Sequence, residues 1–335
     1  QAEARALLKK IEEGDPEISK KARELTERCV SAQYETDFAY SIFHTALIFE
    51  SDIVRTIFQE GIGLLKSSNA IILEKEGKNA GCWVVKLGEK FQKLQDPDKI
   101  LVRSDGTTTY TGKDLIFQLW KLGKLKGRFG YKPFLKQPNG KTAFATGGKN
   151  PKPFGNADMV VNVIGSEQIY PQEVIREVLL RLGHAKEAGR YIHLAHEHVV
   201  LPEEKLSGRS GTWKGFTADE LLEESVRRAK EKISGEFTED EKEKIARAVG
   251  EGAIRYSFIR TTPEKKLVFK WEEALSLEGN SGPYLQYAYV RARKILEKAG
   301  RAKAAPASYQ FNAEERKLVL EMCMFPELVE KAASS

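Results

Sequence analysis

The chain has 335 residues, of which 41% are hydrophobic and 30% are charged, and its formal net charge at pH 7 is +6. This length allows two or three domains with a sizeable core, and the composition is that of a globular protein rather than a disordered one. No run of about 18 apolar residues occurs, so we expect no membrane-spanning helix. The three cysteines, Cys29, Cys82 and Cys323, are far apart, which excludes a zinc ribbon and favours the cytoplasm as the location.

Residues 1–98 are predicted to be mainly helical. Apolar side chains recur at three- and four-residue spacing over residues 1–66, with a break at Gly14-Asp15-Pro16. The stretch "AIILEKEGKNAGCWVVKL" that follows predicts two short strands joined by a turn. The charged N-terminal segment has no apolar core of a signal peptide, and it begins with Gln rather than Met.

Strands and helices alternate in residues 99–235. "KILVRSDGTTTYTGKDLIFQLWKLG" predicts a strand, an Asp-Gly turn and a helix. "ADMVVNVIG" predicts a strand buried on both faces because its apolar run is nearly continuous, and "SEQIYPQEVIREVLLRLG" predicts a helix. This alternation indicates an α/β fold with parallel strands.

Residues 236–335 show amphipathic helices with few strand signals. Thr238 and Glu241 have the spacing of a capping box at the start of the first of these helices. We therefore place a domain boundary near residue 235 and expect an all-α helical bundle after it.

Tyr110 and Asp114 are the first candidate binding pair. They are four residues apart, so they share a face if this segment is helical. A carboxylate accepts two parallel N–H bonds from a guanidinium, and an aromatic ring offers it a flat apolar neighbour. The alternative is an ordinary helix start capped by Thr109 or Thr111, and spacing alone leaves both interpretations open.

The end of the predicted strand at 159–165 is a second candidate site. Gly165, Ser166, Glu167 and Gln168 lie where the strand gives way to a helix, and ligands bind at such strand ends in open α/β sheets. A helix-capping role is the alternative. Of the five histidines, three lie at 193, 196 and 198, but their spacing matches no metal motif, so we predict no metal site.

A third candidate is the loop "KLSGRSG" after the strand-like "HVVLP". Lys205 and Arg209 supply positive charge, Ser207 supplies a hydroxyl, and Gly208 and Gly211 let the backbone approach a phosphate. A plain surface turn is the alternative. In the last third, Tyr284 and Tyr287 are followed by the basic residues Arg291, Arg293 and Lys294, a pattern that suits unstacked RNA bases as well as core packing.

These strings, taken in order, resemble arginyl-tRNA synthetase, a class I aminoacyl-tRNA synthetase, and most closely its archaeal type. "RSDGTTTYTGKD", "VNVIGSEQ", "LPEEKLSGRSG" and "GNSGPYLQYA" carry the resemblance. It implies a Rossmann-like catalytic core, of which 99–235 is the second half and carries the loop that corresponds to "KMSKS". Residues 1–98 are then an α+β insertion, and 236–335 an incomplete, all-α anticodon-binding domain.

The resemblance also implies an activity and roles for single residues. The enzyme would activate L-arginine with ATP and Mg²⁺ to arginyl-adenylate and transfer it to tRNA(Arg), as a cytoplasmic monomer. Tyr110 and Asp114 would bind the arginine side chain, and Gln168 its α-ammonium group. The other implied residues are Lys205, Ser207 and Arg209 in the catalytic loop, Gly165, Glu167, Val200, Leu201 and Lys205 at ATP, and Tyr284, Gln286, Tyr287 and Arg291 at tRNA.

The sequence departs from this family pattern in two places. The loop lacks the second lysine of its signature, and Arg209 is the next cation. No His-x-Gly-His string occurs. We therefore expect a central and C-terminal portion of such an enzyme that does not form adenylate alone. The alternative is a non-catalytic RNA-binding or assembly module. A cysteinyl enzyme is disfavoured because the cysteines form no zinc set.

Overall fold

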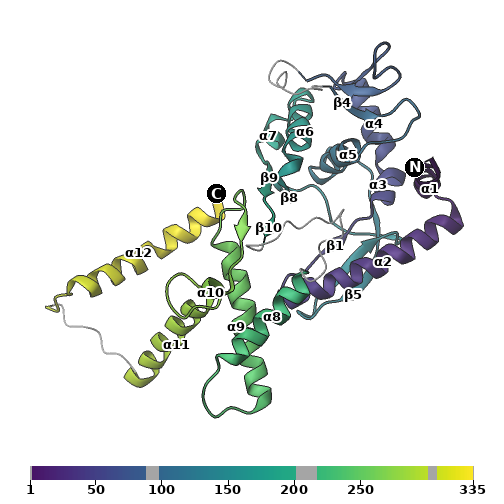
Figure 1. Cartoon of the computed structure of the whole chain (residues 1–335). Coiled ribbons are helices and arrows are strands. Elements are labelled where there is room, and N and C mark those ends of the chain that lie inside the picture. The colour runs from purple at the N-terminus through teal and green to yellow at the C-terminus, as the bar shows by residue number, and fades with distance from the viewer. Residues whose placement is uncertain (1, 88–97, 201–216, 301–307, 335) are drawn as a thin grey trace. The chain divides into compact units, whose positions relative to one another are not determined.

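The structure is a computed structural model that describes residues 2–87, 98–200, 217–300 and 308–334. It divides into two compact units, Gln1–Tyr284 and Leu285–Ser335 (Figure 1). The first unit is a mixture of helices and small sheets, and the described part of the second unit is helical. This order, α/β followed by all-α, confirms the predicted fold class.

The chain begins with two helices separated where the sequence predicted a break. α1 (Ala2–Glu13) ends before Gly14, whose φ of +87° is one that glycine adopts readily. The Asp15 carboxylate then caps α2 (Pro16–Ala39) by accepting a 2.9 Å bond from the Ile18 amide. Two shorter helices follow, α3 (Glu50–Thr56) and α4 (Phe58–Ser67).

A small antiparallel sheet comes next and includes the two strands predicted within 70–87. Its strands are β2 (Ile72–Leu73), β3 (Trp83–Val85) and β4 (Lys99–Val102). β4 leads through the predicted Asp105-Gly106 turn into α5 (Tyr110–Lys121). α5 is central to the core, because its side chains at 115, 116 and 119 are fully buried.

A hairpin that the sequence analysis did not predict follows α5. β5 (Gly130–Lys136) and β6 (Thr142–Thr146) pair antiparallel across a turn at Asn139-Gly140, where the φ of Gly140 is +79°. An Asn-Gly pair between apolar segments is a strong hairpin signal, so this element was predictable. β1 (Ala46–Leu47) and β7 (Asn150–Pro151) complete the sheet in the order β1-β6-β5-β7.

The parallel part of the fold is a β-α-β unit. β8 (Val160–Gly165) continues through the 3₁₀ turn η2 (Ser166–Gln168) into α6 (Ile169–Arg181) and α7 (Ala185–Gly189), and β9 (Tyr191–His196) pairs parallel to β8. The main core joins α5 and α6 to residues 160 and 191 of this sheet.

The prediction that β8 is buried on both faces was wrong for the described residues. Val161 and Val163 are 49% and 64% exposed, whereas Val160 and Asn162 are buried. The physical reason is alternation: successive side chains point to opposite faces, and only one face of β8 packs against the main core.

The last part of the first unit is helical. α8 (Ala218–Glu231) and α9 (Glu239–Ile259) pack against each other, and Thr238 and Glu241 form the predicted capping box. α10 (Trp271–Ala274) lies beside α9, and β10 (Val199–Val200) pairs parallel with β11 (Leu267–Val268). The domain boundary expected near residue 235 falls in the loop between α8 and α9, whereas the structure divides into its two units after Tyr284. The assignment of functional domains to residues 1–98, 99–235 and 236–335 stays a prediction.

The second unit continues α11 (Gly282–Ala299), which starts in the first unit, and includes α12 (Ala313–Ser334). Apolar side chains such as Leu318, Met322, Phe325 and Val329 are more than half exposed on α12. Among the described helices of either unit, none is long and apolar enough to cross a membrane.

Candidate functional site

The first turn of α5 is held tightly against β4. The Thr109 hydroxyl caps the helix, accepting a 3.1 Å bond from the Gly112 amide and donating a 2.8 Å bond to the Ile100 carbonyl. A Cβ on Gly112 would lie 2.6 Å from the Leu101 carbonyl oxygen, so only glycine allows this close approach. Thr109, rather than Thr111, is therefore the cap, and it fixes the helix that carries the candidate pair.

Tyr110 and Asp114 sit one turn apart on α5 but differ in surroundings. The Tyr110 side chain is 80% exposed, whereas Asp114 is half-buried. Within the described residues, no hydrogen bond or ion pair reaches the Asp114 carboxylate. Burial raises the pKa of Asp114, the positive charge of Lys121 opposes that shift, and the negative charge of Glu50 adds to it. An anion without a partner is a ready receptor for a ligand cation.

The neighbouring Lys113 does not neutralise Asp114, because it is paired elsewhere. Its ammonium lies 2.5 Å from the carboxylates of both Glu12 on α1 and Glu50 on α3, and its side chain is only 6% exposed. Burial lowers the pKa of Lys113, but the bonds to these two acids outweigh it and leave that pKa raised. Lys113 therefore links α5 to α1 and α3 through its two ion pairs. It forms no ion pair with the Asp114 carboxylate.

The residues predicted at the strand end lie together at the carboxyl end of β8. Gly165 is the last residue of β8 and is buried, and Glu167 and Gln168 form the turn η2 that leads into α6. The Glu167 carboxylate lies over Gly165, because a Cβ there would fall 2.3 Å from it. The Ser166 hydroxyl donates to Glu197, just beyond β9. Polar side chains thus lie at the carboxyl end of β8, and their role at a ligand stays a prediction.

The nucleotide part of the predicted site is only partly described. Val200 is in β10 and is half-buried. Leu201, Lys205, Ser207 and Arg209 lie outside the described residues, so their predicted roles at ATP stay predictions.

Comparisons with known proteins give the same family over nearly the whole chain. The chain is 43% identical to the arginine–tRNA ligase of Thermococcus sibiricus over 98% of its length, and 42% identical to that of Pyrococcus abyssi over 99%. It covers 54% of each of these relatives. The solved Thermus thermophilus arginyl-tRNA synthetase matches 97% of the chain with a TM-score of 0.82 and 36% identity, and the chain covers 55% of it.

The chain is therefore a relative of the arginyl-tRNA synthetases over nearly its whole length. It spans about half the length of the curated relatives it matches. The resemblance found in the sequence is thereby confirmed, together with the class I synthetase fold that it implied.

The second unit of this synthetase relative matches a model described as the DALR anticodon binding domain, over residues 285–335. Three of the residues predicted to contact tRNA, Gln286, Tyr287 and Arg291, lie in that range, and Tyr284 directly precedes it. Tyr284 and Tyr287 are 41% and 49% exposed, and the Arg291 guanidinium lies 5.5 Å from the Tyr287 ring. An exposed aromatic beside a cation suits a nucleic-acid base, although the contact itself stays a prediction.

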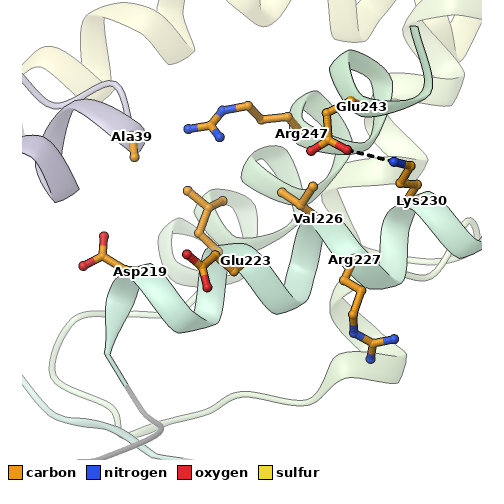
Figure 2. Close-up of a pocket in the computed structure, with 9 residues that line it drawn as sticks. Ala39, Asp219, Glu223, Val226, Arg227, Lys230, Glu243 and Arg247 are labelled. Carbon is orange, nitrogen blue, oxygen red and sulfur yellow. Dashed lines mark hydrogen bonds and ion pairs between the residues drawn. The ribbon is translucent and has the colours of Figure 1, made fainter. Parts of the chain in front are cut away.

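A pocket of about 420 Å³ lies between α8, α9 and the end of α2 (Figure 2). The Lys230 ammonium meets the Glu243 carboxylate at 3.0 Å, and the Arg247 side chain extends toward Ala39. Acidic and basic groups alternate around the pocket, so its charge favours neither an anion nor a cation.

A metal ion has no evident binding site within the described ranges, because no group of three or more His, Cys, Asp or Glu side chains could hold one there.

The sequence analysis missed two sets of polar residues next to the candidate site. One is the Lys113 pair with Glu12 and Glu50, which joins residues far apart in sequence and left no local signal. The other is Gln118 and Lys121, which form a polar stripe with the predicted Asp114 at positions i+4 and i+7 from it on α5. The stripe's helical spacing was visible, but it is usually the mark of a solvated face.

Proposed function

We propose that the chain is the arginine- and ATP-binding part of an arginine–tRNA ligase, which forms arginyl-adenylate from L-arginine and ATP and transfers arginine to tRNA(Arg). The observation that carries this proposal is the open Asp114 carboxylate on α5, within the string "YTGKD" shared with the family pattern. A carboxylate that no neighbour satisfies binds a guanidinium in two parallel N–H bonds.

The arrangement around Asp114 supports arginine over a smaller cation. Tyr110 stands exposed one turn before it and offers the guanidinium plane an aromatic neighbour. Gln168 lies at the β8 end, where its amide would reach the α-ammonium end of the substrate. These three residues remain the proposed arginine contacts.

ATP and tRNA complete the proposal. Gly165, Glu167, Val200 and Leu201 would border the nucleotide, and Lys205, Ser207 and Arg209 would steady its phosphates together with Mg²⁺. The chemistry needs no covalent enzyme intermediate, because positioning and charge stabilisation suffice for displacement at the α-phosphate. Tyr284, Gln286, Tyr287 and Arg291 would contact tRNA, and a monomeric state and a cytoplasmic location belong to the same proposal.

The relatives reported above are named as ligases or synthetases, which favours the catalytic proposal over the non-catalytic alternative. Pyrophosphate exchange with the full natural protein and tRNA distinguishes the two. We expect exchange that depends on L-arginine and not on lysine. Absence of exchange with arginine would contradict the proposal.

The Lys205→Ala change tests the proposed ATP-binding role separately from the arginine contacts. We expect this change to slow adenylate formation while arginine affinity stays close to wild type, because the lysine acts on phosphate. A defect confined to the arginine KM would contradict the phosphate role.

A further inference from the structure

The parallel strand pair of the first unit ends at the point where its two segments separate. Its last paired residues are Gly165 on β8 and His196 on β9. Beyond them β8 turns into η2, which includes the proposed arginine contact Gln168. β9 continues to β10, which includes the proposed ATP contact Val200. The proposed contacts of the two substrates therefore lie on the two segments that diverge here.

A side-chain hydrogen bond joins the two segments directly after the last backbone pair. The next residue of each segment is Ser166 and Glu197 respectively, and the Ser166 hydroxyl donates to Glu197 Oε1. Both residues are half-buried. A hydroxyl that donates to a carboxylate makes a stronger bond than one between two neutral groups. This bond therefore extends the connection between the segments by one residue beyond the backbone ladder.

A third segment holds the backbone of Glu197. The Glu197 amide donates a 2.8 Å bond to the Pro263 carbonyl, in the loop that follows α9. Just beyond, β10 pairs with β11, and the Phe269 amide donates a 2.9 Å bond to the Val200 carbonyl. Glu197 is therefore attached to the η2 segment by its side chain and to the α9–β11 segment by its backbone.

Apolar packing contributes little at this end of the two strands. The residues of β8 and β9 that belong to the main core are Val160 and Tyr191, which pair with each other at the opposite end. Closer to the point of separation, Val163 is 64% exposed and Leu194 is 38% exposed. The hydrogen bond between Ser166 and Glu197 is thus placed where the core does not hold the two segments together.

We propose that Glu197 is a positioning residue, which acts through Ser166 to fix the separation between the arginine contact on η2 and the ATP contact on β10. This inference rests on the proposed function, because that function places the two substrates on these segments. In adenylate formation an oxygen of the arginine carboxylate bonds to the α-phosphorus of ATP as pyrophosphate leaves. A displacement of about 1 Å between two such reactants can lower the rate about a hundredfold.

Pyrophosphate exchange with the full natural protein tests this link in Ser166→Ala, Glu197→Ala and the double variant. We expect kcat to fall about ten- to hundredfold in each single variant. The arginine KM and the ATP KM should change less, because each substrate keeps its own contacts. The double variant should be no slower than the slower single variant, because both changes remove the same bond. Additive losses, or a loss confined to one KM, would overturn the proposal.

Two further variants separate positioning from general damage. Glu197→Gln is nearly isosteric and keeps an oxygen that accepts from Ser166, so its kcat should lie between those of wild type and Glu197→Ala. Thr36→Val is the matched control, because the Thr36 hydroxyl donates a 2.9 Å bond to the Asp219 carboxylate and neither residue is a proposed substrate contact. Its kcat should stay near wild type. An equal fall in Thr36→Val, or a Glu197→Gln variant as slow as Glu197→Ala, would overturn the proposal.

A measurement without substrates tests the link apart from the proposed function. Amide hydrogen–deuterium exchange at residues 165–168 should be faster in Ser166→Ala than in wild type, because the bond that holds η2 is lost. Equal exchange in the folded variant would overturn the positioning role. A wild type that shows no arginine-dependent pyrophosphate exchange would overturn the proposed function. An active wild type with an unchanged kcat in Ser166→Ala would overturn only the positioning role.

Discussion

Two acidic residues of the first unit, Asp52 on α3 and Asp114 on α5, show how differently a helix can present a carboxylate. Asp52 is 9% exposed and is fully engaged: Arg23 donates to it at 2.7 Å and the Thr146 hydroxyl at 2.5 Å. Asp114 is half-buried, and no described residue donates to it. The first arrangement stabilises the fold, whereas the second leaves capacity for a ligand.

The largest effect that separates the two acids should come from Asp114→Asn. We expect arginine-dependent kcat/KM to fall about a hundredfold or more, because a guanidinium loses its charged partner, at about 3–5 kcal/mol. The melting temperature should stay at or slightly above that of wild type, because no described ion pair is lost. Pyrophosphate exchange and thermal unfolding check both expectations, and a large loss of stability would show that Asp114 resembles Asp52 after all.

The matched change Asp52→Asn should act in the opposite way. It leaves the partly buried Arg23 without its carboxylate, so the free energy of unfolding should fall by about 3 kcal/mol. The arginine KM of the folded enzyme should stay within about twofold of wild type. Denaturant unfolding gives the free energy of unfolding, and pyrophosphate exchange gives the arginine KM. An increase in the arginine KM as large as that of Asp114→Asn would show that Asp52 and Asp114 do not differ in their role.

The Thr109→Ala change sharpens the comparison at the level of the helix that carries Asp114. It removes the cap of α5, and we expect a loss of about 1 kcal/mol of unfolding free energy. Because the cap fixes the turn that holds the candidate pair, a modest rise in the arginine KM should accompany it. A loss of stability with no change in KM would show that the cap does not position the site.

We expect the smallest effect in how the difference in unfolding free energy between wild type and Asp114→Asn changes with pH. The folded-state pKa of Asp114 is raised, so the folded chain binds that proton more tightly than the unfolded chain does. The ionised carboxylate therefore lowers stability above its folded pKa, and this penalty disappears as the pH falls through it. Unfolding of wild type and Asp114→Asn across pH should show a stability gap that narrows toward acid; a gap that widens would contradict the burial of Asp114.

The sequence predicted the local elements around the site well, because their signals are local. Periodicity and the Asp105-Gly106 turn located β4 and α5, and the apolar run at 159–165 located β8. It did not predict which face of β8 is covered, because the run 159–165 carries no information about its neighbours. The Asn139-Gly140 hairpin had a readable signal and was overlooked.

The candidate site was predictable to a lesser extent. Spacing alone left Tyr110 and Asp114 undecided between a receptor and a helix start, and the structure shows that Thr109 caps the helix while Asp114 stays open. Lys113 and Lys121 look alike in sequence. Lys113 is paired with two acids and Lys121 donates to Asn162, and only the tertiary contacts distinguish them.

The central claim is that Asp114 is an anion reserved for arginine. Its most direct test is the arginine KM of Asp114→Asn beside that of Asp52→Asn in the full natural protein, with the melting temperatures measured on the same samples. The account predicts that arginine recognition is lost only in Asp114→Asn, and stability only in Asp52→Asn. An unchanged arginine KM in Asp114→Asn would contradict it.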